Sequence, residues 1–232
     1  TEADAVKKII QMADEAGCPL YIVHVSTKKA IAHIEEAQQN GQLVVAETCP
    51  HYLLLDEAKY IGDFGETVKY VLSPPLRKKL DNEALWQAMA NGVVSTVGTD
   101  HCPFTLAQKS AGKDDFRKIP NGAGGIEHRL PLLLTHTLHY NKLSATKLTD
   151  LISTQPAKIF GIFPQKGILQ EGADADIVVW KPEGKHIISA ETHHQNSDIN
   201  IYEGTETRGT ITHLLKKGET VIEQGKFTFP EI

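Results

Sequence analysis

The feature that most constrains the fold is a regular alternation of helical and β-rich segments in the first half of the chain. Val6, Ile10 and Ala13 recur at helical spacing between a possible N-cap, Thr1, and the helix-ending Gly17. The expected order is helix 1–16, strand 19–25, a helix between Ser26 or Thr27 and Asn40–Gly41, strand 43–46, a long loop-rich stretch, helix 83–90 and strand 93–97. Strands that alternate with helices predict a parallel sheet that is covered on both faces.

The second half of the chain changes character. Residues 130–138 and 144–160 have helical patterns, and Pro156 is expected to interrupt the second one. From Gly161 the apolar runs become short and alternating, as at 177–180 and 210–215, and glycines separate them. We therefore expect an α/β domain over residues 1–160 and short antiparallel strands over 161–232.

Composition excludes several classes of partner. The 24 Lys and Arg against 29 Asp and Glu give a formal charge of -5, with no basic block that would follow a phosphate backbone. No apolar run approaches the roughly 20 residues of a membrane helix, and the start at Thr1 has neither part of a signal peptide. We expect no nucleic-acid or membrane partner, a cytoplasmic location and three reduced cysteines. A start without Met makes a fragment possible.

Two polar residues stand at the ends of predicted strands. His24 follows Tyr21–Val23, and Asp100 follows Val97–Thr99. The carboxyl ends of the strands form the active-site face of a β/α barrel, and imidazole and carboxylate are both suitable ligands of zinc or a related divalent ion. The structural alternative is a hydrogen-bonded histidine and an aspartate that caps a turn.

A series of longer segments carries a family resemblance. They are YIVHVS (21–26), ETCPHYLLLD (47–56), LSPPLR (72–77), GTDHCPF (98–104), NGAGGIEHRLPLL (121–133), GADADIVVWKP (172–182) and HHQNSDINIYEG (193–204). In this order the chain resembles the dihydropyrimidinase and D-hydantoinase family of metal-dependent amidohydrolases. The resemblance implies part of a TIM-like (β/α)8 barrel, from strand six onward, followed by the C-terminal part of a small β-sandwich.

The resemblance also implies site residues and a cofactor. His24 matches a metal-binding histidine, and Asp100 matches the aspartate that binds metal and serves as the catalytic proton-transfer base. Ser73 and Asn121 match loop residues whose main-chain groups bind the cyclic amide substrate. For both, the alternative is a turn residue, before Pro74 and with Gly122 respectively. The implied cofactor is two divalent metal ions, zinc by resemblance.

Other candidate side chains receive structural interpretations. His51 stands where the family often has glutamine and is not assigned as a ligand. His101 adjoins Asp100, but neighbours on a strand point to opposite faces. His193–His194 are assigned a structural or assembly role. Cys102 lacks an obvious activating base, which disfavours a nucleophilic cysteine.

The resemblance leaves part of the metal centre without a counterpart. The family also uses an HxH pair, a carboxylated lysine and a further histidine, whereas only 23 residues precede His24. We therefore expect the isolated chain to be inactive and its partners to be an N-terminal half-barrel and further copies in a homo-oligomer, a tetramer in the family. The expected activity is the opening of dihydropyrimidines and hydantoins to N-carbamoyl amino acids. The alternatives are a non-catalytic assembly scaffold of the collapsin-response-mediator type, which retention of His24 and Asp100 disfavours, and an allantoinase- or dihydroorotase-type hydrolase.

Overall fold

The computed structural model describes residues 1–228, which divide into two compact units. Unit 1 comprises residues 1–129 together with 189–203, and unit 2 comprises 130–188 and the described residues from Gly204 onward. The boundary between the units thus falls between residues 129 and 130, and residues 189–203 belong to unit 1. The boundary expected near residue 160 concerns the barrel and sandwich of the whole protein, and it stays a prediction.

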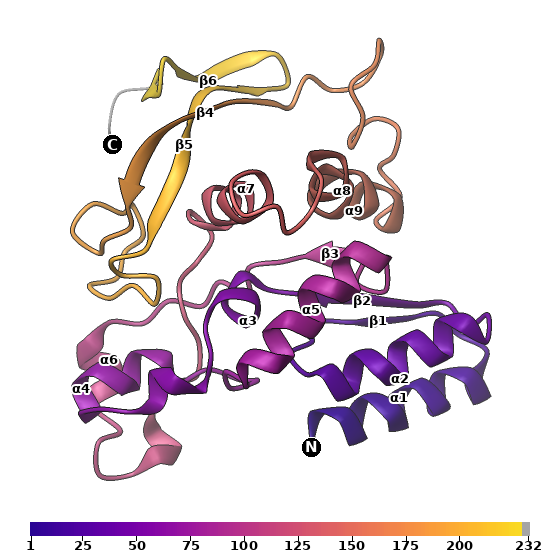
Figure 1. Ribbon diagram of the computed structural model, residues 1–232, viewed down its shortest axis with the longest axis vertical. Helices are drawn as coiled ribbons and strands as arrows, with labels where there is room; N and C mark the ends of the chain where they lie inside the picture. Colours follow the sequence, from indigo (N-terminus) through magenta and orange to yellow (C-terminus); the bar gives the residue numbers. More distant parts are fainter. Residues whose placement is uncertain (229–232) are drawn as a thin grey trace. The chain divides into compact units, whose positions relative to one another are not determined.

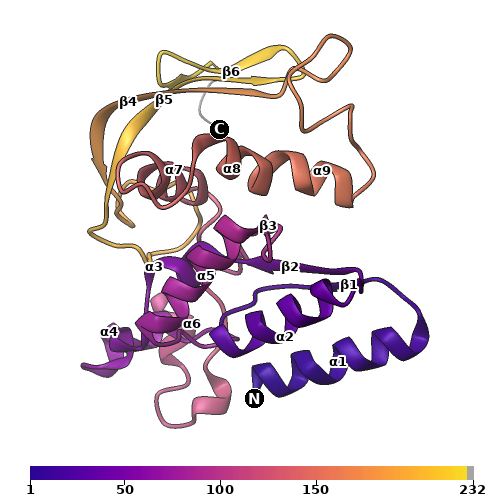
Figure 2. The same ribbon diagram turned by 45° about the vertical axis from the view of Figure 1, so that its right-hand side comes forward.

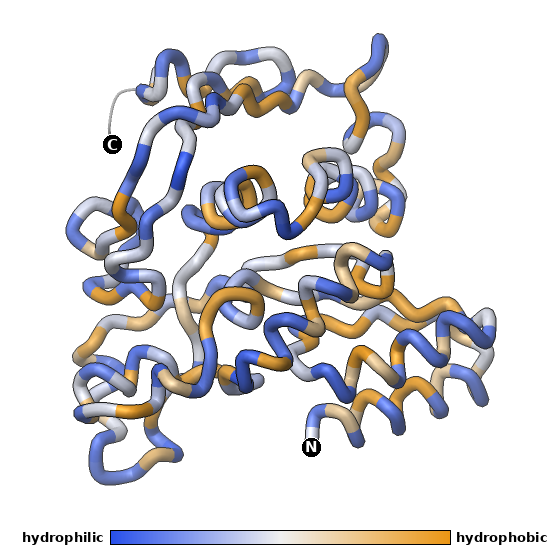
Figure 3. The backbone as a smooth tube through the Cα atoms, in the orientation of Figure 1, coloured by the Kyte–Doolittle hydropathy of each residue, from blue (hydrophilic) through white to orange (hydrophobic). Residues whose placement is uncertain are grey.

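Unit 1 contains a three-stranded parallel sheet, as the alternation of segments predicts. Its strands are β1 (Leu20–Ile22), β2 (Val44–Thr48) and β3 (Thr96–Val97), in the order β1-β2-β3. The register pairs Ile22 with Ala46 and Thr48 with Val97. The strands are coloured mainly as hydrophobic in Figure 3, in keeping with a sheet that is packed by helices.

Three long helices accompany this sheet and lie beside one another in both views (Figures 1 and 2). They are α1 (Glu2–Ala16), α2 (Lys28–Gln39) and α5 (Lys79–Asn91). Thr1 caps α1 and the left-handed Gly17 ends it, as expected. Ile34, Leu85 and Met89 are fully buried, so the apolar faces of α2 and α5 form the core of the unit.

The stretch expected to be rich in loops contains short helical turns. They are α3 (Pro50–Leu54), η1 (Glu57–Tyr60), α4 (Phe64–Thr67) and η2 (Val68–Tyr70), and after β3 come α6 (Leu106–Ser110) and η3 (Phe116–Lys118). Each has five residues or fewer, which is too short for a periodic pattern to reveal.

Unit 2 contains a four-stranded antiparallel sheet, as the glycine-punctuated runs predict. Its strands are β4 (Ile177–Ile187), β5 (Glu206–Lys216), β6 (Glu219–Glu223) and β7 (Lys226–Phe227), hydrogen-bonded in that order. A Cβ on Gly209, which has φ 86°, would lie 2.1 Å from the Trp180 ring. The indole therefore requires glycine opposite it.

The helices of unit 2 correct one expectation. Besides α7 (Arg129–Leu138), a continuous helical run comprises α8 (Ala145–Thr149), the π-helical segment η4 (Asp150–Thr154) and α9 (Gln155–Ile159). Pro156 does not interrupt this run: it lies in the first turn of α9, directly after the π-helical segment. The wider π-turn precedes it, with the Gln155 N–H donating to Asp150 O.

Within residues 1–228, no helix has both the length and the apolar character that crossing a membrane requires.

Candidate active site

His24 and Asp100 share an unusual backbone conformation. Both have positive φ, 42° for His24 and 46° for Asp100, although neither is glycine. His24 lies two residues beyond β1, and Asp100 lies three residues beyond β3. Non-glycine residues in this region carry a conformational cost, and such residues cluster at functional sites. The sheet thus presents two strained polar residues at its carboxyl edge.

The end of β2 lies between these two residues. The Val25 N–H donates to Glu47 O (2.7 Å), and the Thr48 hydroxyl donates back to Val25 O (2.8 Å). On the other side, the Gly98 N–H donates to Thr48 O (2.9 Å). Because neighbouring strands are about 4.8 Å apart, the two flanking strand ends are about 10 Å apart. The backbone segments that carry His24 and Asp100 therefore flank the same end of β2.

The donors present fit a divalent metal in type and fall short in number. An imidazole nitrogen and a carboxylate oxygen are common zinc ligands, and a catalytic zinc site takes about three protein ligands. No group of three or more His, Cys, Asp or Glu side chains in residues 1–228 is placed to hold a metal ion. His24 and Asp100 are two donors, fewer than the three that such a site takes.

His51 is the second histidine at this edge. It lies in α3, is 4% exposed, and its Nε2 has no hydrogen-bond partner within the described structure. Burial, and to a smaller extent the charge of His24, lower the pKa of His51 to about 4. His51 is therefore neutral at neutral pH. Sequence reasoning assigned no role to His51, and the structure places it close enough to His24 for the two charges to interact.

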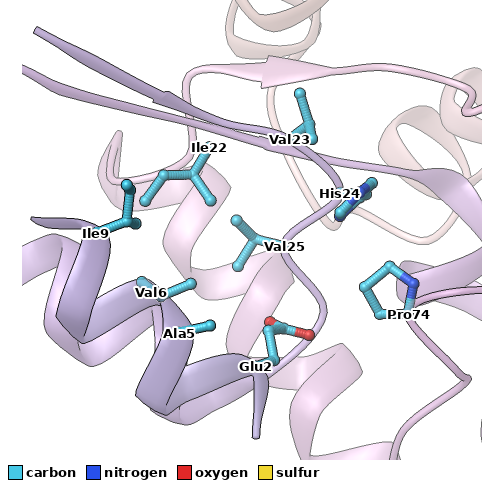
Figure 4. A pocket seen from close by; sticks show the side chains of 9 residues that line it. All are labelled: Glu2, Ala5, Val6, Ile9, Ile22, Val23, His24, Val25 and Pro74. Atoms are coloured by element: carbon cyan, nitrogen blue, oxygen red, sulfur yellow. The ribbon is translucent and has the colours of Figure 1, made fainter.

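An apolar pocket of about 270 Å³ lies beside His24 (Figure 4). It is lined by Glu2, Ala5, Val6, Ile9, Ile22, Val23, His24, Val25 and Pro74. Figure 4 shows His24 and Pro74 at one end and Ile9 and Ile22 toward the other. Because only Glu2 and His24 among these carry charged or titratable groups, the pocket lacks the several polar groups that would orient a cyclic amide.

Ser73 and Asn121, which are far apart in the sequence, meet in the structure. The Ser73 hydroxyl donates to Asn121 Oδ1 (3.1 Å), and the Gly122 N–H donates to Val71 O (3.2 Å). Both side chains are exposed. We call residues 71–75 the serine loop and residues 119–123 the asparagine loop.

The asparagine loop also runs beside the residues that follow Asp100. His101 forms a parallel bridge with Ala123, and the Cys102 N–H donates to Ala123 O (3.0 Å). A Cβ on Gly122, which has φ 147°, would lie 2.6 Å from Cys102 O. The close approach therefore requires glycine after Asn121, which explains the Asn-Gly pair.

The His101 side chain binds the backbone that follows the asparagine loop. Its Nδ1 accepts the N–H groups of Gly125 (3.1 Å) and Ile126 (3.3 Å). With Nδ1 used as an acceptor, the imidazole fixes the turn that follows the asparagine loop.

A charged cluster joins the residues after His24 to Arg77, which lies two residues beyond the serine loop. The Glu2 carboxylate accepts hydrogen bonds from the backbone N–H groups of Ser26 (3.0 Å) and Thr27 (3.1 Å) and from both hydroxyls. Arg77, from LSPPLR, donates to Glu2 (3.0 Å) and to the Ser26 hydroxyl (2.9 Å). We call these residues the Glu2 cluster. Sequence reasoning missed it because a glutamate in the first turn of a helix is normally solvated.

The buried side chain of Tyr52 holds the serine loop. Its side chain is 1% exposed, and its hydroxyl donates to Pro74 O (2.7 Å). Burial raises the pKa of this phenol far above its usual range, so it remains a proton donor. The serine loop is thus held at Pro74 by Tyr52, and the residues directly after the loop are held at Arg77 by Glu2.

Residues 193–200 pack on the segment that follows the asparagine loop. The Asn200 amide nitrogen lies 2.8 Å from His128 Nε2 and 3.2 Å from His193 Nδ1. The His194 N–H and Nδ1 both contact the Glu127 carboxylate at 2.8 Å. Burial lowers the pKa of His128, which favours the neutral ring in this cluster. His193 and His194 thus hold unit 1 together, consistent with a structural assignment.

Comparison with known proteins gives a consistent result. The model of the amidohydrolase family matches residues 1–221. The D-hydantoinase of Geobacillus stearothermophilus is 42% identical over 227 residues, which cover 97% of this chain and 48% of that protein. The D-phenylhydantoinase of Escherichia coli is 40% identical over 229 residues, which cover 98% of this chain and 49% of that protein.

Solved structures agree with these relatives. The dihydropyrimidinase of Brevibacillus agri superposes with a TM-score of 0.94 at 44% identity, covering 98% of this chain and 50% of that one. The L-hydantoinase of Arthrobacter aurescens gives a TM-score of 0.90 at 31% identity, with the same coverage. The chain spans about half the length of the relatives that it matches. On the match over residues 1–221, the chain belongs to the amidohydrolase family.

Proposed function

We propose that the protein to which this chain belongs is a metal-dependent cyclic amidohydrolase that opens dihydropyrimidine and hydantoin rings to N-carbamoyl amino acids. The observation that carries the proposal is the pair of left-handed residues, His24 and Asp100, at the carboxyl edge of one parallel sheet. The D-hydantoinases and dihydropyrimidinases that resemble the chain support the substrate class.

His24 and Asp100 would hold divalent metal, with zinc as the expected ion. When bound, the metal would activate water and polarise the ring carbonyl. Asp100 acts as the general base: it accepts a proton as the water oxygen bonds to the carbonyl carbon, and it delivers that proton to the ring nitrogen as the C–N bond breaks. Asp100 is exposed at the carboxyl edge of the sheet.

The serine and asparagine loops would bind the ring. A cyclic amide presents an N–H donor and a C=O acceptor in fixed relation, and main-chain groups can match both. Ser73 and Asn121 lie within hydrogen-bonding distance of each other, so the two loops form one surface. The asparagine loop ends at Ala123, which forms a bridge with His101 directly after Asp100, and this supports recognition close to the base.

The further architecture follows from the incomplete set of ligands. We propose that residues 1–160 form barrel strands six to eight with their helices and that 161–232 complete a small β-sandwich. The remaining ligands would come from an N-terminal half-barrel, so the isolated chain is expected to be inactive. Assembly as a homo-oligomer and a cytoplasmic location stay predictions.

The test is ring opening by the intact protein. We expect hydrolysis of dihydrouracil or hydantoin that is lost on chelation and restored by zinc, with lower activity on allantoin and dihydroorotate. Preference for either of the last two would move the assignment to those hydrolases. Absence of all four activities in a metal-loaded, folded protein would refute the enzyme and favour the scaffold alternative. The chain of residues 1–232, assayed alone with zinc, should be silent.

A further inference from the structure

Lys109 is a buried cation with no acidic partner. It lies in α6, and its side chain is fully buried. Its ammonium donates to Val71 O (2.8 Å) and Pro120 O (3.0 Å), and it lies 5.6 Å from the centroid of the Phe104 ring. Among the ion pairs of residues 1–228, none includes Lys109. Burying an ammonium is costly, so its persistence here calls for a reason.

The two carbonyl groups that accept from the Lys109 ammonium belong to the two loops described above. Val71 belongs to the serine loop, two residues before Ser73, and Pro120 belongs to the asparagine loop, directly before Asn121. One ammonium therefore joins the backbones of both loops from beneath. The exposed hydrogen bond between Ser73 and Asn121 is a second link between the two loops.

Helix α6, which carries Lys109, is held in place at its start and at the turn after it. Thr105 and Gln108 form a reciprocal capping box at the start of α6. The Leu106 N–H donates to the Asp198 carboxylate (2.7 Å), which ties α6 to the segment 189–203. A Cβ on Gly112 would lie 2.3 Å from Ile119 Cγ1, so the turn after α6 lies directly against the asparagine loop. The start of α6 is thus fixed by contacts outside the two loops, and the turn that follows it packs against the asparagine loop.

We propose that Lys109 is a positioning residue, which sets the spacing of the serine and asparagine loops so that their main-chain groups match the two ends of a cyclic amide. The proposal rests on the proposed function for the identity of the ligand. An apolar side chain of the same length would fill the space, but it would leave Pro120 O without this donor and Val71 O with the Gly122 N–H alone. Burial lowers the pKa of Lys109 to about 8, so the ammonium form still predominates at neutral pH.

The test compares three variants of the intact enzyme. Lys109→Met keeps the length and removes the donors, whereas Lys109→Arg keeps charge and donors and adds bulk. Lys113→Met changes an exposed lysine in the turn after the same helix and serves as the matched control. Steady-state hydrolysis of hydantoin and dihydrouracil and hydrogen exchange of residues 71–75 and 119–123 are measured for each.

Loss of ring positioning should appear as a loss of binding. For Lys109→Met we expect KM to rise about tenfold or more, with kcat within about threefold of wild type, because uniform binding is what the loops supply. Exchange in both loops should accelerate about tenfold or more, while Lys113→Met and the metal content stay unchanged. Lys109→Arg should lie closer to wild type than Lys109→Met in both measurements.

Three results would overturn the proposal: unchanged KM and loop exchange in a folded Lys109→Met variant, a lowered kcat with unchanged KM, or a Met variant closer to wild type than the Arg variant. The last would show that volume alone matters. If Lys109→Met does not fold, Lys109→Arg decides, since retained donors predict near-normal KM and loop protection. A wild-type enzyme that opens no ring refutes the proposed function, and loop exchange in the variants still decides the role of Lys109.

Discussion

The Glu2 cluster offers a sharp quantitative test of how the His24 segment is held. The Glu2 and Arg77 side chains are 12% and 26% exposed, so water only partly screens them. Glu2→Gln keeps the shape but removes the charge that Arg77 contacts at 3.0 Å. A hydrogen bond to a charged group contributes about 1.5–3 kcal/mol, and the new amide N–H faces donors on Ser26 or Thr27, which adds about 1 kcal/mol. We expect a destabilisation of about 3 kcal/mol.

A double-mutant cycle separates this interaction from unrelated effects. Arg77→Met should also cost about 3 kcal/mol, because it leaves a partly buried carboxylate without its cation. The double variant should cost about 4 kcal/mol, which gives a coupling energy of about 2 kcal/mol. Urea unfolding of the intact protein provides the free energies, and Glu36→Gln on the exposed side of α2 is the control. Additive effects, each below about 0.5 kcal/mol, would show that the cluster is solvated and would refute the reasoning.

Three further predictions follow from particular residues. Asp100→Asn should reduce turnover of the metal-loaded enzyme at least about a hundredfold, since a general base and a metal-binding charge are lost together, and near-normal turnover would exclude both roles. Gly209→Ala should destabilise the protein by about 3 kcal/mol or more because the methyl would meet the Trp180 ring, whereas Gly218→Ala, with similar φ and open space, should cost about 1 kcal/mol in the same thermal unfolding assay. Burial lowers the pKa of Lys109 from 10.5 to about 8, so between these pH values the unfolded chain binds more protons than the folded protein. As the pH rises through this range, wild type should therefore gain stability relative to Lys109→Met by up to about 1.4 kcal/mol per pH unit. A difference in unfolding free energy that stays constant from about pH 7.5 to 9.5 would contradict this prediction.

Periodicity predicted the long elements of the fold because they obey local rules. Helices α1 and α2 have an apolar face, a capping side chain and a terminal glycine or asparagine, all of which are visible in the sequence. The short turns α3 and α6 were not predicted, because five residues cannot display a period. The continuity of the helix through Pro156 was missed because the preceding π-turn depends on backbone geometry that composition does not encode.

The candidate site shows the same division. The positions of His24 and Asp100 at strand ends could be predicted, since a polar residue after a buried strand is a local pattern. The cation of Lys109 and the carboxylate of Glu2 could not be singled out, because each looks like an ordinary surface charge in a helix. Their importance lies in partners that are 11 to 75 residues away in the chain.

The return of residues 189–203 to unit 1 has a consequence for the order of folding. The Asn200 amide meets His128 across 72 residues, and closing a flexible loop of that length costs about 4 kcal/mol in chain entropy. The Ile188 N–H donates to Thr205 O (3.0 Å), and the Gly204 N–H donates to Ile188 O (2.9 Å), so the ladder of β4 and β5 fastens the two ends of this segment together. During synthesis, the segment of unit 1 before Arg129 emerges well before the residues that complete it. Pairing of β4 with β5 therefore closes residues 189–203 into a loop before this loop packs on unit 1. We expect unit 1 to be completed only after β4 and β5 have paired.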